Sequence, residues 1–240
     1  EIRRGRWHAL VCDEDAAAIA AALIERAGCT PVDIGGRGHV FRFEYAGGAG
    51  LVRPCRRGGL MQRISRDAFL LINRPLREFR VHRYAAERGL SVPPVLGVCW
   101  QRRGLLVHGA LATRLLEARN LLESLREPPE DLPQMLYACG AAIRKMHDVG
   151  ICHADLQLGN ILVTDSGPYI IDFDKARMRR PLSKTQRAHN LLRLRRSFEK
   201  HGAPAKAFQG LCEGYGVERF PPWLDGAYRL KGRLSDILGR

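Results

Sequence analysis

The chain has 240 residues, of which 45% are hydrophobic, so it can bury a substantial core and wholesale disorder is not expected. Its 39 lysines and arginines outnumber its 25 aspartates and glutamates, and the formal net charge is +14. Such a surface favours anionic partners: nucleic acid, an acidic membrane face or a phosphorylated substrate. The seven cysteines include no Cys-x-x-Cys pair and are odd in number, which indicates reduced thiols rather than a disulfide framework or a zinc site.

A short helix is the first element that the sequence predicts. Acidic residues precede residues 16–26, an arginine ends this run, and Gly28 follows it. The uncharged apolar stretch 16–24 is only about half of a membrane span. We therefore expect a helix that packs on the first part of the fold, with neither a spanning helix nor a signal peptide.

A glycine-containing loop and two strands come next. Aromatic residues at every second position of 41–45 predict one strand, residues 47–50 a turn, and residues 51–53 the start of the next strand. Before these strands lie Gly36 and Gly38. Glycines allow backbone N–H groups to approach a phosphate without obstruction by side chains, although a lone Gly-x-Gly is more often an ordinary turn.

Three arginines follow this loop. Arg53 lies on the second strand, and Arg56 and Arg57 open a basic, glycine-punctuated segment. Each of them could be an ordinary exposed charge. Beside a phosphate-binding loop, Arg53 could instead contact a nucleotide, and Arg56 and Arg57 could dock an anionic substrate.

The next helix carries a candidate partner for Arg53. Residues 75–88 begin with proline and precede Gly89, which are start and stop signals of a helix. Glu78 is the preferred partner, and Glu87 is the less favoured alternative. Strands are then predicted at 92–98 and 104–107, and 111–116 is predicted to connect two lobes.

A long amphipathic helix leads into the most informative stretch. Apolar residues recur at helical spacing and the pattern ends at Gly150: Leu132, Leu136, Cys139, Ile143 and Met146. Directly after Gly150 come His153, Asp155 and Asn160 in the spacing His-x-Asp-x-x-x-x-Asn.

A β-hairpin is predicted immediately after Asn160. Two hydrophobic runs, 161–163 and 169–171, flank a turn that contains glycine and proline, and Asp172 follows the second run. Such a hairpin brings Asn160 and Asp172 to the same end of two paired strands. An Asp-rich pair of turns around an ordinary hairpin is the simpler alternative, but it does not account for the whole set of residues.

This arrangement suits phosphoryl transfer. Asp155 can orient an attacking hydroxyl and accept its proton, while Asn160 and Asp172 can hold Mg²⁺ on the phosphates of ATP. The order and spacing match the catalytic loop and metal-binding motif of kinases. We therefore predict an α+β, protein-kinase-like fold of two lobes. Residues 1–112 would form a lobe with an antiparallel sheet and a helix, and residues 113–240 a helical lobe with the catalytic-loop hairpin.

Several motifs together resemble the lipopolysaccharide kinase family. They are His153–Leu162 with Ile171–Asp174, Gly36–Gly38, Arg53 with Arg56–Leu60, Arg77–Arg80 and Asn190–Ser197. Many kinases share the first of these, whereas the Arg-Arg-Gly-Gly-Leu run and the Asn-Leu-x-Arg-Leu-x-Arg-Ser run point to this family. Within it, the chain is most similar to the branch that phosphorylates 3-deoxy-D-manno-octulosonic acid (Kdo).

The resemblance implies a substrate and a location. It implies transfer of the γ-phosphate of ATP to the 4-hydroxyl of Kdo on Kdo–lipid A, at the cytoplasmic face of the inner membrane. An anionic glycolipid in an anionic leaflet fits the charge of +14. Peripheral membrane binding is then expected, whereas the sequence contains no nucleic-acid-binding motif.

The sequence is also compatible with other functions. Ala154 replaces the arginine of protein kinases that pairs with a phosphorylated activation loop, and the short segment after Asp174 leaves little room for peptide docking. Both features favour a small or lipid-linked hydroxyl acceptor. The alternatives are a heptose kinase of the same family, another small-molecule phosphotransferase, and a membrane-binding pseudokinase that lacks the usual strand lysine.

Overall fold

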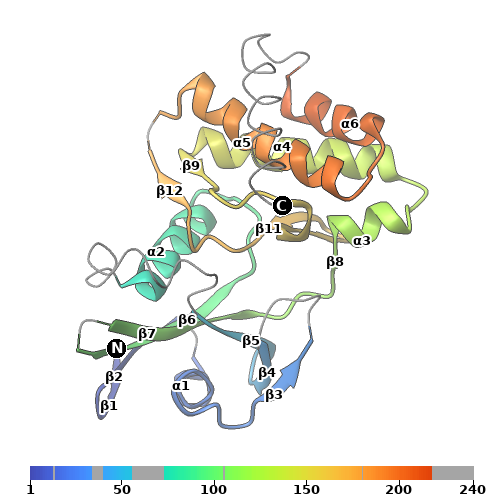
Figure 1. Ribbon diagram of the computed structural model, residues 1–240. Coiled ribbons are helices and arrows are strands. Elements are labelled where there is room, and N and C mark those ends of the chain that lie inside the picture. Colours follow the sequence, from blue (N-terminus) through green and yellow to red (C-terminus); the bar gives the residue numbers. More distant parts are fainter. Residues whose placement is uncertain (13, 34–39, 56–72, 105, 180, 218–240) are drawn as a thin grey trace, which may run out of the picture. The chain divides into compact units, whose positions relative to one another are not determined.

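The computed structural model describes residues 1–12, 14–33, 40–55, 73–104, 106–179 and 181–217 (Figure 1). Its contacts divide the chain into two compact units. The first contains residues 1–87 and 92–117, and the second contains residues 88–91 and 118–240. The first unit extends to Glu117, five residues beyond the expected boundary after residue 112. Residue 112 itself lies inside a strand that spans Leu106–Arg114.

The first unit is built on an antiparallel sheet. Seven strands of the described residues follow one another across it in the order β1 (Ile2–Arg4), β2 (Trp7–Val11), β6 (Val95–Arg103), β7 (Leu106–Arg114), β5 (Gly48–Pro54), β4 (Val40–Tyr45) and β3 (Thr30–Val32). Each neighbouring pair is antiparallel. The long strands β6 and β7 lie side by side near the centre (Figure 1).

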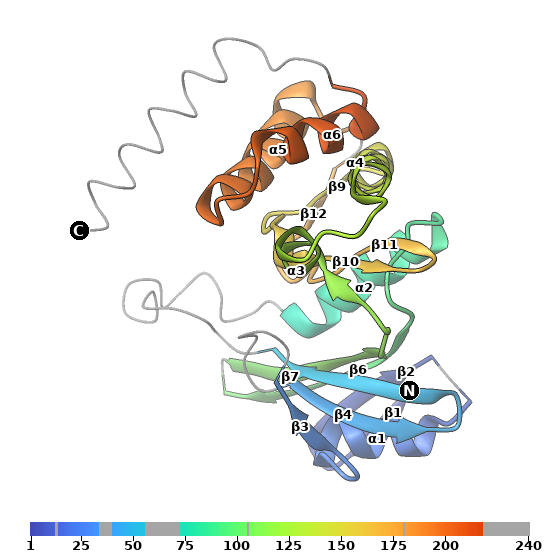
Figure 2. The same cartoon turned by 90° about the vertical axis from the view of Figure 1, so that its right-hand side faces the viewer.

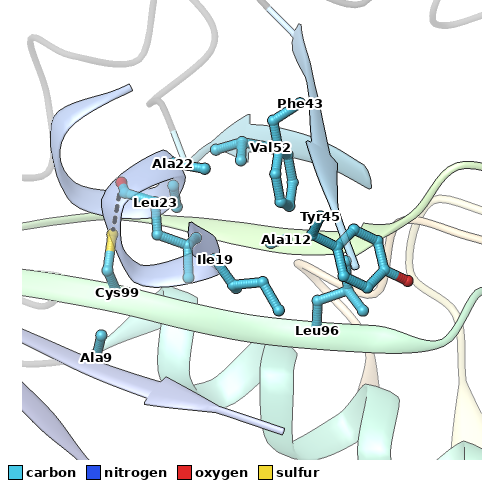
Figure 3. Packing of buried hydrophobic residues seen from close by; sticks show 11 residues of the cluster. Ala9, Ile19, Ala22, Leu23, Phe43, Tyr45, Val52, Leu96, Cys99 and Ala112 are labelled. Atoms are coloured by element: carbon cyan, nitrogen blue, oxygen red, sulfur yellow. Dashed lines mark hydrogen bonds between the residues drawn. The ribbon is translucent and has the colours of Figure 1, made fainter. Parts of the chain in front are cut away.

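Two helices cover opposite faces of this sheet. Helix α1 (Ala16–Glu25) packs on one face, where apolar side chains form a buried cluster that includes Ile19, Leu23, Phe43, Leu96 and Cys99 (Figure 3). Helix α2 (Arg74–Glu87) contributes Phe79 to a separate cluster with Val98 and Leu111. Val98 directly precedes Cys99 in β6, so the two side chains point to opposite faces of the sheet.

The predicted turn at residues 47–50 was wrong in part. Tyr45 pairs with Gly48, so only two residues form the turn, and Gly48–Gly50 already belong to β5. A Cβ atom at Gly50 would lie 2.5 Å from ring atoms of Phe43, so glycine is present here because an aromatic ring packs on the strand. The alternation predicted for 41–45 is present, since Phe43 and Tyr45 are buried while the residue between them is exposed.

The predicted connector at 111–116 also differs from the structure. Leu111–Arg114 are part of β7, where Leu111 pairs with Arg53 of β5 on one side and Val98 of β6 on the other. Because helices cover both faces of this sheet, its central strand β7 is buried on both sides here and reads as an uninterrupted apolar run.

The second unit is mainly helical. Its described helices are α3 (Leu121–Arg126), α4 (Leu132–Asp148), α5 (Lys184–Lys200) and α6 (Ala205–Tyr215), as Figure 2 shows. A Cβ at Gly140 of α4 would lie 1.9 Å from the carbonyl oxygen of Leu211 in α6. Glycine therefore permits these two helices to cross in backbone contact.

Short strands complete the described part of the second unit. They are β8 (Arg119–Asn120), β9 (Ile151–Cys152), β10 (Ile161–Thr164), β11 (Gly167–Ile170) and β12 (Arg177–Met178), with the 3₁₀ turn η2 (Leu158–Asn160) before β10. Strand β10 pairs with β11 and β8, and β9 pairs with β12. The long helix predicted before Gly150 is present as α4, and Cys139, Ile143 and Met146 are fully buried in it.

Two sequence expectations concern the chain as a whole. All seven cysteines are free thiols, as predicted. Among the residues that the structure describes, no helix combines the length and the apolar character that crossing a membrane requires.

Candidate active site

The β10–β11 hairpin brings two of the predicted residues together. Ile161 pairs with Ile170 at its open end, and the N–H of Ile171 donates a 3.1 Å hydrogen bond to the carbonyl oxygen of Asn160. Asp172 is the next residue. Asn160 and Asp172 therefore lie at the same end of the hairpin, where the sequence placed them.

Asn160 and Asp172 are held in defined conformations. The side chain of Asn160 is 1% exposed, and its Nδ2 donates to the carbonyl oxygen of Asp155 over 2.8 Å, which fixes the orientation of the amide. Asp172 has a φ of 68°, a left-handed conformation that non-glycine residues adopt rarely and that recurs at functional sites. Amide and carboxylate oxygens are ligands that Mg²⁺ prefers, so this pair fits a magnesium site.

His153 links the catalytic loop to the strand that precedes Asp172. Its Nδ1 accepts the N–H of Asp155 at 3.2 Å, so its Nε2 carries the hydrogen and donates to the carbonyl oxygen of Ile171 over 2.9 Å. The ring is completely buried and packs on Phe173, with 5.3 Å between the ring centroids. Burial lowers the pKa of His153, which favours a neutral ring with a structural role.

Asp155 is more accessible than His153 and Asn160. Its side chain is 39% exposed, and its Oδ1 lies 3.8 Å from Nη1 of Arg193 on α5. The backbone on either side of this carboxylate is fixed, because His153 holds the N–H of Asp155 and Asn160 holds its carbonyl oxygen. A fixed backbone with an accessible carboxylate is what a group that meets a substrate hydroxyl requires.

Helix α5 supports the catalytic loop with three polar side chains. Asn190, Arg193 and Ser197 lie three and four residues apart, so they share one face of the helix. Asn190 accepts the N–H of His153 over 3.1 Å and donates to the carbonyl oxygen of the same residue. Ser197 Oγ accepts the N–H of Leu158 at 3.1 Å.

The sequence pattern indicated this face of α5 but not its role. Asn190, Arg193 and Ser197 belong to the run quoted for the family resemblance, and their helical spacing among buried leucines was visible. Their partners were not visible, because the contact with His153 spans a separation of 37 residues.

A second buried histidine extends this network. His147 of α4 donates from Nε2 to Asn190 Oδ1 over 2.9 Å and accepts at Nδ1 from the Tyr215 hydroxyl at 2.9 Å. Burial lowers the pKa of His147 to about 4, so its ring is neutral near pH 7. This environment makes His147 a residue of the core.

The first unit contains the remaining predicted pair that the structure describes. Arg53 of β5 forms an ion pair with Glu78 of α2, as the sequence suggested. Glu78 is 1% exposed, whereas the side chain of Arg53 is 33% exposed. The alternative partner, Glu87, pairs with Arg83 on the surface of α2. A buried carboxylate therefore fixes an arginine whose side chain stays partly accessible.

Four predicted residues lie outside the described part of the chain. They are Gly36 and Gly38 of the glycine loop and Arg56 and Arg57 of the basic segment.

A comparison with protein-family models matched residues 33–215 to the lipopolysaccharide kinase (Kdo/WaaP) family. The 3-deoxy-D-manno-octulosonic acid kinase of Xylella fastidiosa (strain M23) is 34% identical over 197 residues, which cover 77% of this chain and 78% of that protein. The kinase of the same name from Xanthomonas axonopodis pv. citri (strain 306) is 38% identical over 176 residues, covering 71% and 70% of the two chains. That from Xanthomonas oryzae pv. oryzae (strain PXO99A) is 36% identical over 206 residues, covering 83% and 79%.

The comparison with solved structures bears on the fold. A structure titled "WaaP in complex with acyl carrier protein" matches with a TM-score of 0.56 and 18% sequence identity, and the match covers 97% of each chain. The likeness confirms the predicted α+β, protein-kinase-like fold.

Proposed function

Because this chain belongs to the lipopolysaccharide kinase (Kdo/WaaP) family and is an ATP-dependent sugar kinase, we propose that its acceptor is Kdo–lipid A and that it phosphorylates the 4-hydroxyl of Kdo. The observation that carries the proposal is the identity of 34% and 38% to Kdo kinases over most of the chain. The grouping of Asp155, Asn160 and Asp172 around one hairpin end supports it, because these are the side chains that phosphoryl transfer needs.

Asp155 is proposed as the catalytic base. Its exposed carboxylate accepts a hydrogen bond from the acceptor hydroxyl, orients that oxygen towards the γ-phosphate and takes the proton as the new bond forms. The hydrogen bonds that the backbone of Asp155 donates to His153 and accepts from Asn160 keep the loop in place during this step. They thereby reduce the entropy that positioning the reactants would otherwise cost.

Asn160 and Asp172 are proposed to hold Mg²⁺. When bound, the metal neutralises charge on the phosphates of ATP. The left-handed backbone at Asp172 and the fixed amide of Asn160 present both side chains from the hairpin end. A carboxylate and an amide oxygen suit this hard cation better than sulfur or nitrogen ligands would.

Arg53 is proposed to contact the phosphates of ATP, and Glu78 to hold it in position. The partial exposure of Arg53 leaves its guanidinium accessible while Glu78 fixes it from the buried side. A guanidinium can grip two phosphate oxygens at once. From the sequence alone, we propose that Gly36 and Gly38 cover the phosphates and that Arg56 and Arg57 contact the acceptor.

We propose peripheral binding at the cytoplasmic face of the inner membrane. The charge of +14 supports attraction to anionic lipids, and the proposed acceptor is itself lipid-linked. Such binding weakens as salt shortens the range of electrostatic attraction, to ~10 Å at 0.1 M. Sedimentation with anionic vesicles tests the idea, and protein that stays on the vesicles at 1 M salt would instead indicate a hydrophobic anchor.

The acceptor is tested by offering two substrates. The protein is incubated with γ-labelled ATP and either Kdo–lipid A or a heptosylated core in which Kdo is already substituted. We expect label in Kdo–lipid A, with the phosphate coupled to the proton on C4 in the NMR spectrum of the product. Preferential labelling of a heptose would favour the heptose kinase instead, and no transfer to either acceptor would favour a pseudokinase or another small-molecule acceptor.

A further inference from the structure

The segment after the hairpin presents arginines beside the catalytic loop. In β12, Arg177 pairs in register with Cys152 of β9, three residues before Asp155. The N–H of Arg179 donates to the carbonyl oxygen of Gly150 over 2.8 Å. Both arginine side chains are exposed, so this segment places accessible positive charge beside β9, the strand that leads into the catalytic loop.

A third arginine approaches the same loop from α5. The side chain of Arg193 is 54% exposed, and its Nη1 lies 3.8 Å from Asp155 Oδ1. Burial raises the pKa of the Cys152 thiol, and the positive charges of Arg177, Arg179 and Arg193 act against this shift. Cys152 lies at the entry to the catalytic loop, so the positive charge of all three arginines acts there.

The charge of this cluster is poorly compensated within the described residues. Arg177 and Arg179 form no ion pair there, and the one carboxylate near Arg193 is that of Asp155. Other arginines of the second unit have dedicated acidic partners: Arg187 pairs with Asp148, and Arg195 pairs with Glu199. The three clustered arginines thus retain a net positive charge beside a carboxylate that must meet a substrate.

An acidic acceptor needs such a charge. A sugar acid that brings its hydroxyl to Asp155 also brings its own carboxylate close to the aspartate, and two like charges in a partly buried site repel one another. A guanidinium offsets this repulsion and can bind a carboxylate through two parallel N–H···O bonds. A neutral sugar would gain nothing from it.

Resting on the proposed function, we propose that Arg193, reinforced by Arg177 and Arg179, binds the carboxylate of the acceptor sugar acid. By holding that carboxylate, Arg193 would decide which hydroxyl of the ring reaches Asp155. The cluster would then select acidic sugars over neutral ones.

The test crosses an enzyme variant with a substrate variant. Acceptor kinetics are measured for the wild type and Arg193→Ala, each with Kdo–lipid A and with the same lipid after its Kdo carboxylate is converted to the methyl ester. We expect Arg193→Ala to raise the KM for Kdo–lipid A ~10- to 100-fold, as loss of a charge-assisted contact implies, with little change in kcat. With the methyl ester, the acceptor KM of the wild type should rise by a similar factor. The KM of Arg193→Ala should not rise further.

Matched variants complete the design. Arg195→Ala removes the same charge from the same helix, but Arg195 pairs with Glu199, so its acceptor KM should stay near that of the wild type. Arg193→Lys keeps the charge but loses the paired N–H donors of the guanidinium. Its acceptor KM should therefore lie between those of Arg193→Ala and the wild type. The thermal unfolding midpoints of the variants show whether each one is folded.

Three results would overturn the proposal. If Arg193→Ala raised the KM relative to the wild type by the same factor for both acceptors, Arg193 would act only on Asp155. An unchanged acceptor KM would mean that the carboxylate binds elsewhere. A folded wild type that transfers phosphate to neither acceptor would refute the proposed function and this inference with it, whereas the first two results leave the proposed function standing.

Discussion

Asn190 of α5 holds the backbone of His153 on both sides, since its Oδ1 accepts the N–H over 3.1 Å and its Nδ2 donates to the carbonyl oxygen. The same Oδ1 also accepts from the buried ring of His147. One side chain therefore ties α4, α5 and the start of the catalytic loop together. The geometry around Asp155 depends on this helix as much as on the loop itself.

Replacing Asn190 should therefore destabilise the protein. In Asn190→Ala, the backbone groups of His153 and the ring of His147 lose buried hydrogen-bond partners. The expected loss is about 2–4 kcal/mol in the free energy of unfolding, measured by urea titration. Ser197→Ala, which removes one contact to the N–H of Leu158, should lose about 1 kcal/mol. Equal stabilities of Asn190→Ala and the wild type would disprove the role of this network.

The buried His147 should make the fold sensitive to acid. Its pKa is about 4 in the folded protein and about 6.5 in the unfolded chain, so the unfolded chain binds more protons between these values. The contribution of this residue is complete above pH 6.5 and is lost as the pH falls towards 4. The slope reaches at most about 1.4 kcal/mol per pH unit.

Unfolding titrations at several pH values measure this slope directly. His147→Gln should show a shallower loss of stability between pH 6.5 and 4 than the wild type, even if it is less stable at pH 7. His189→Gln, which changes an exposed histidine of α5, should retain the slope of the wild type. An identical slope for His147→Gln and the wild type would contradict the assignment.

Arg53 should matter for ATP rather than for the acceptor. Arg53→Ala removes the proposed phosphate contact and the ion pair of the buried Glu78, so the KM for ATP should rise ~10-fold or more and the unfolding midpoint should fall. Arg53→Lys should retain part of the activity. Arg83→Ala breaks an exposed ion pair on α2, the helix that contains Glu78, and serves as the control. An ATP KM and kcat within about twofold of the wild type would limit the contribution of Arg53 to ~0.5 kcal/mol.

Asp172 should be required for metal-dependent binding of ATP. Asn tolerates the left-handed conformation that Asp172 adopts, so Asp172→Asn removes the charge with little strain. Calorimetric titration with ATP should show an affinity at least ~10-fold lower than that of the wild type when Mg²⁺ is present. When EDTA removes the metal, the affinities of Asp172→Asn and the wild type for ATP should differ little. Asp165→Asn makes the same change in the exposed hairpin turn and should bind like the wild type. Unchanged affinity of Asp172→Asn with Mg²⁺ would contradict the proposed ligand set.

Local patterns predicted the elements that carry the candidate site. The hairpin after Asn160 was predictable because two apolar runs flank a turn with glycine and proline, and α4 was predictable because its apolar residues follow the helical period. The pairing of Arg53 with Glu78 followed from the order of the motifs. In each case, residues close in sequence, or a fixed order of motifs, contained the information.

Features that depend on distant contacts were not predictable. Gly50 lies in a strand because the ring of Phe43 packs on it, whereas glycine in the sequence indicated a turn. Leu111 lies in β7 because strands pair with it on both sides. The link between Asn190 and His153 joins a helix to a loop far away in the sequence, and no local period reveals such a partner.

The most direct test of the account is phosphate transfer from γ-labelled ATP to Kdo–lipid A by the wild type, Asp155→Ala and Asp165→Ala. If Asp155 is the catalytic base, the wild type and Asp165→Ala should label the lipid at similar rates, and Asp155→Ala should be slower by roughly 10²–10⁴-fold while still binding ATP. Label that enters the lipid at the wild-type rate with Asp155→Ala, or no label with the wild type, would contradict the central claim that this loop phosphorylates Kdo.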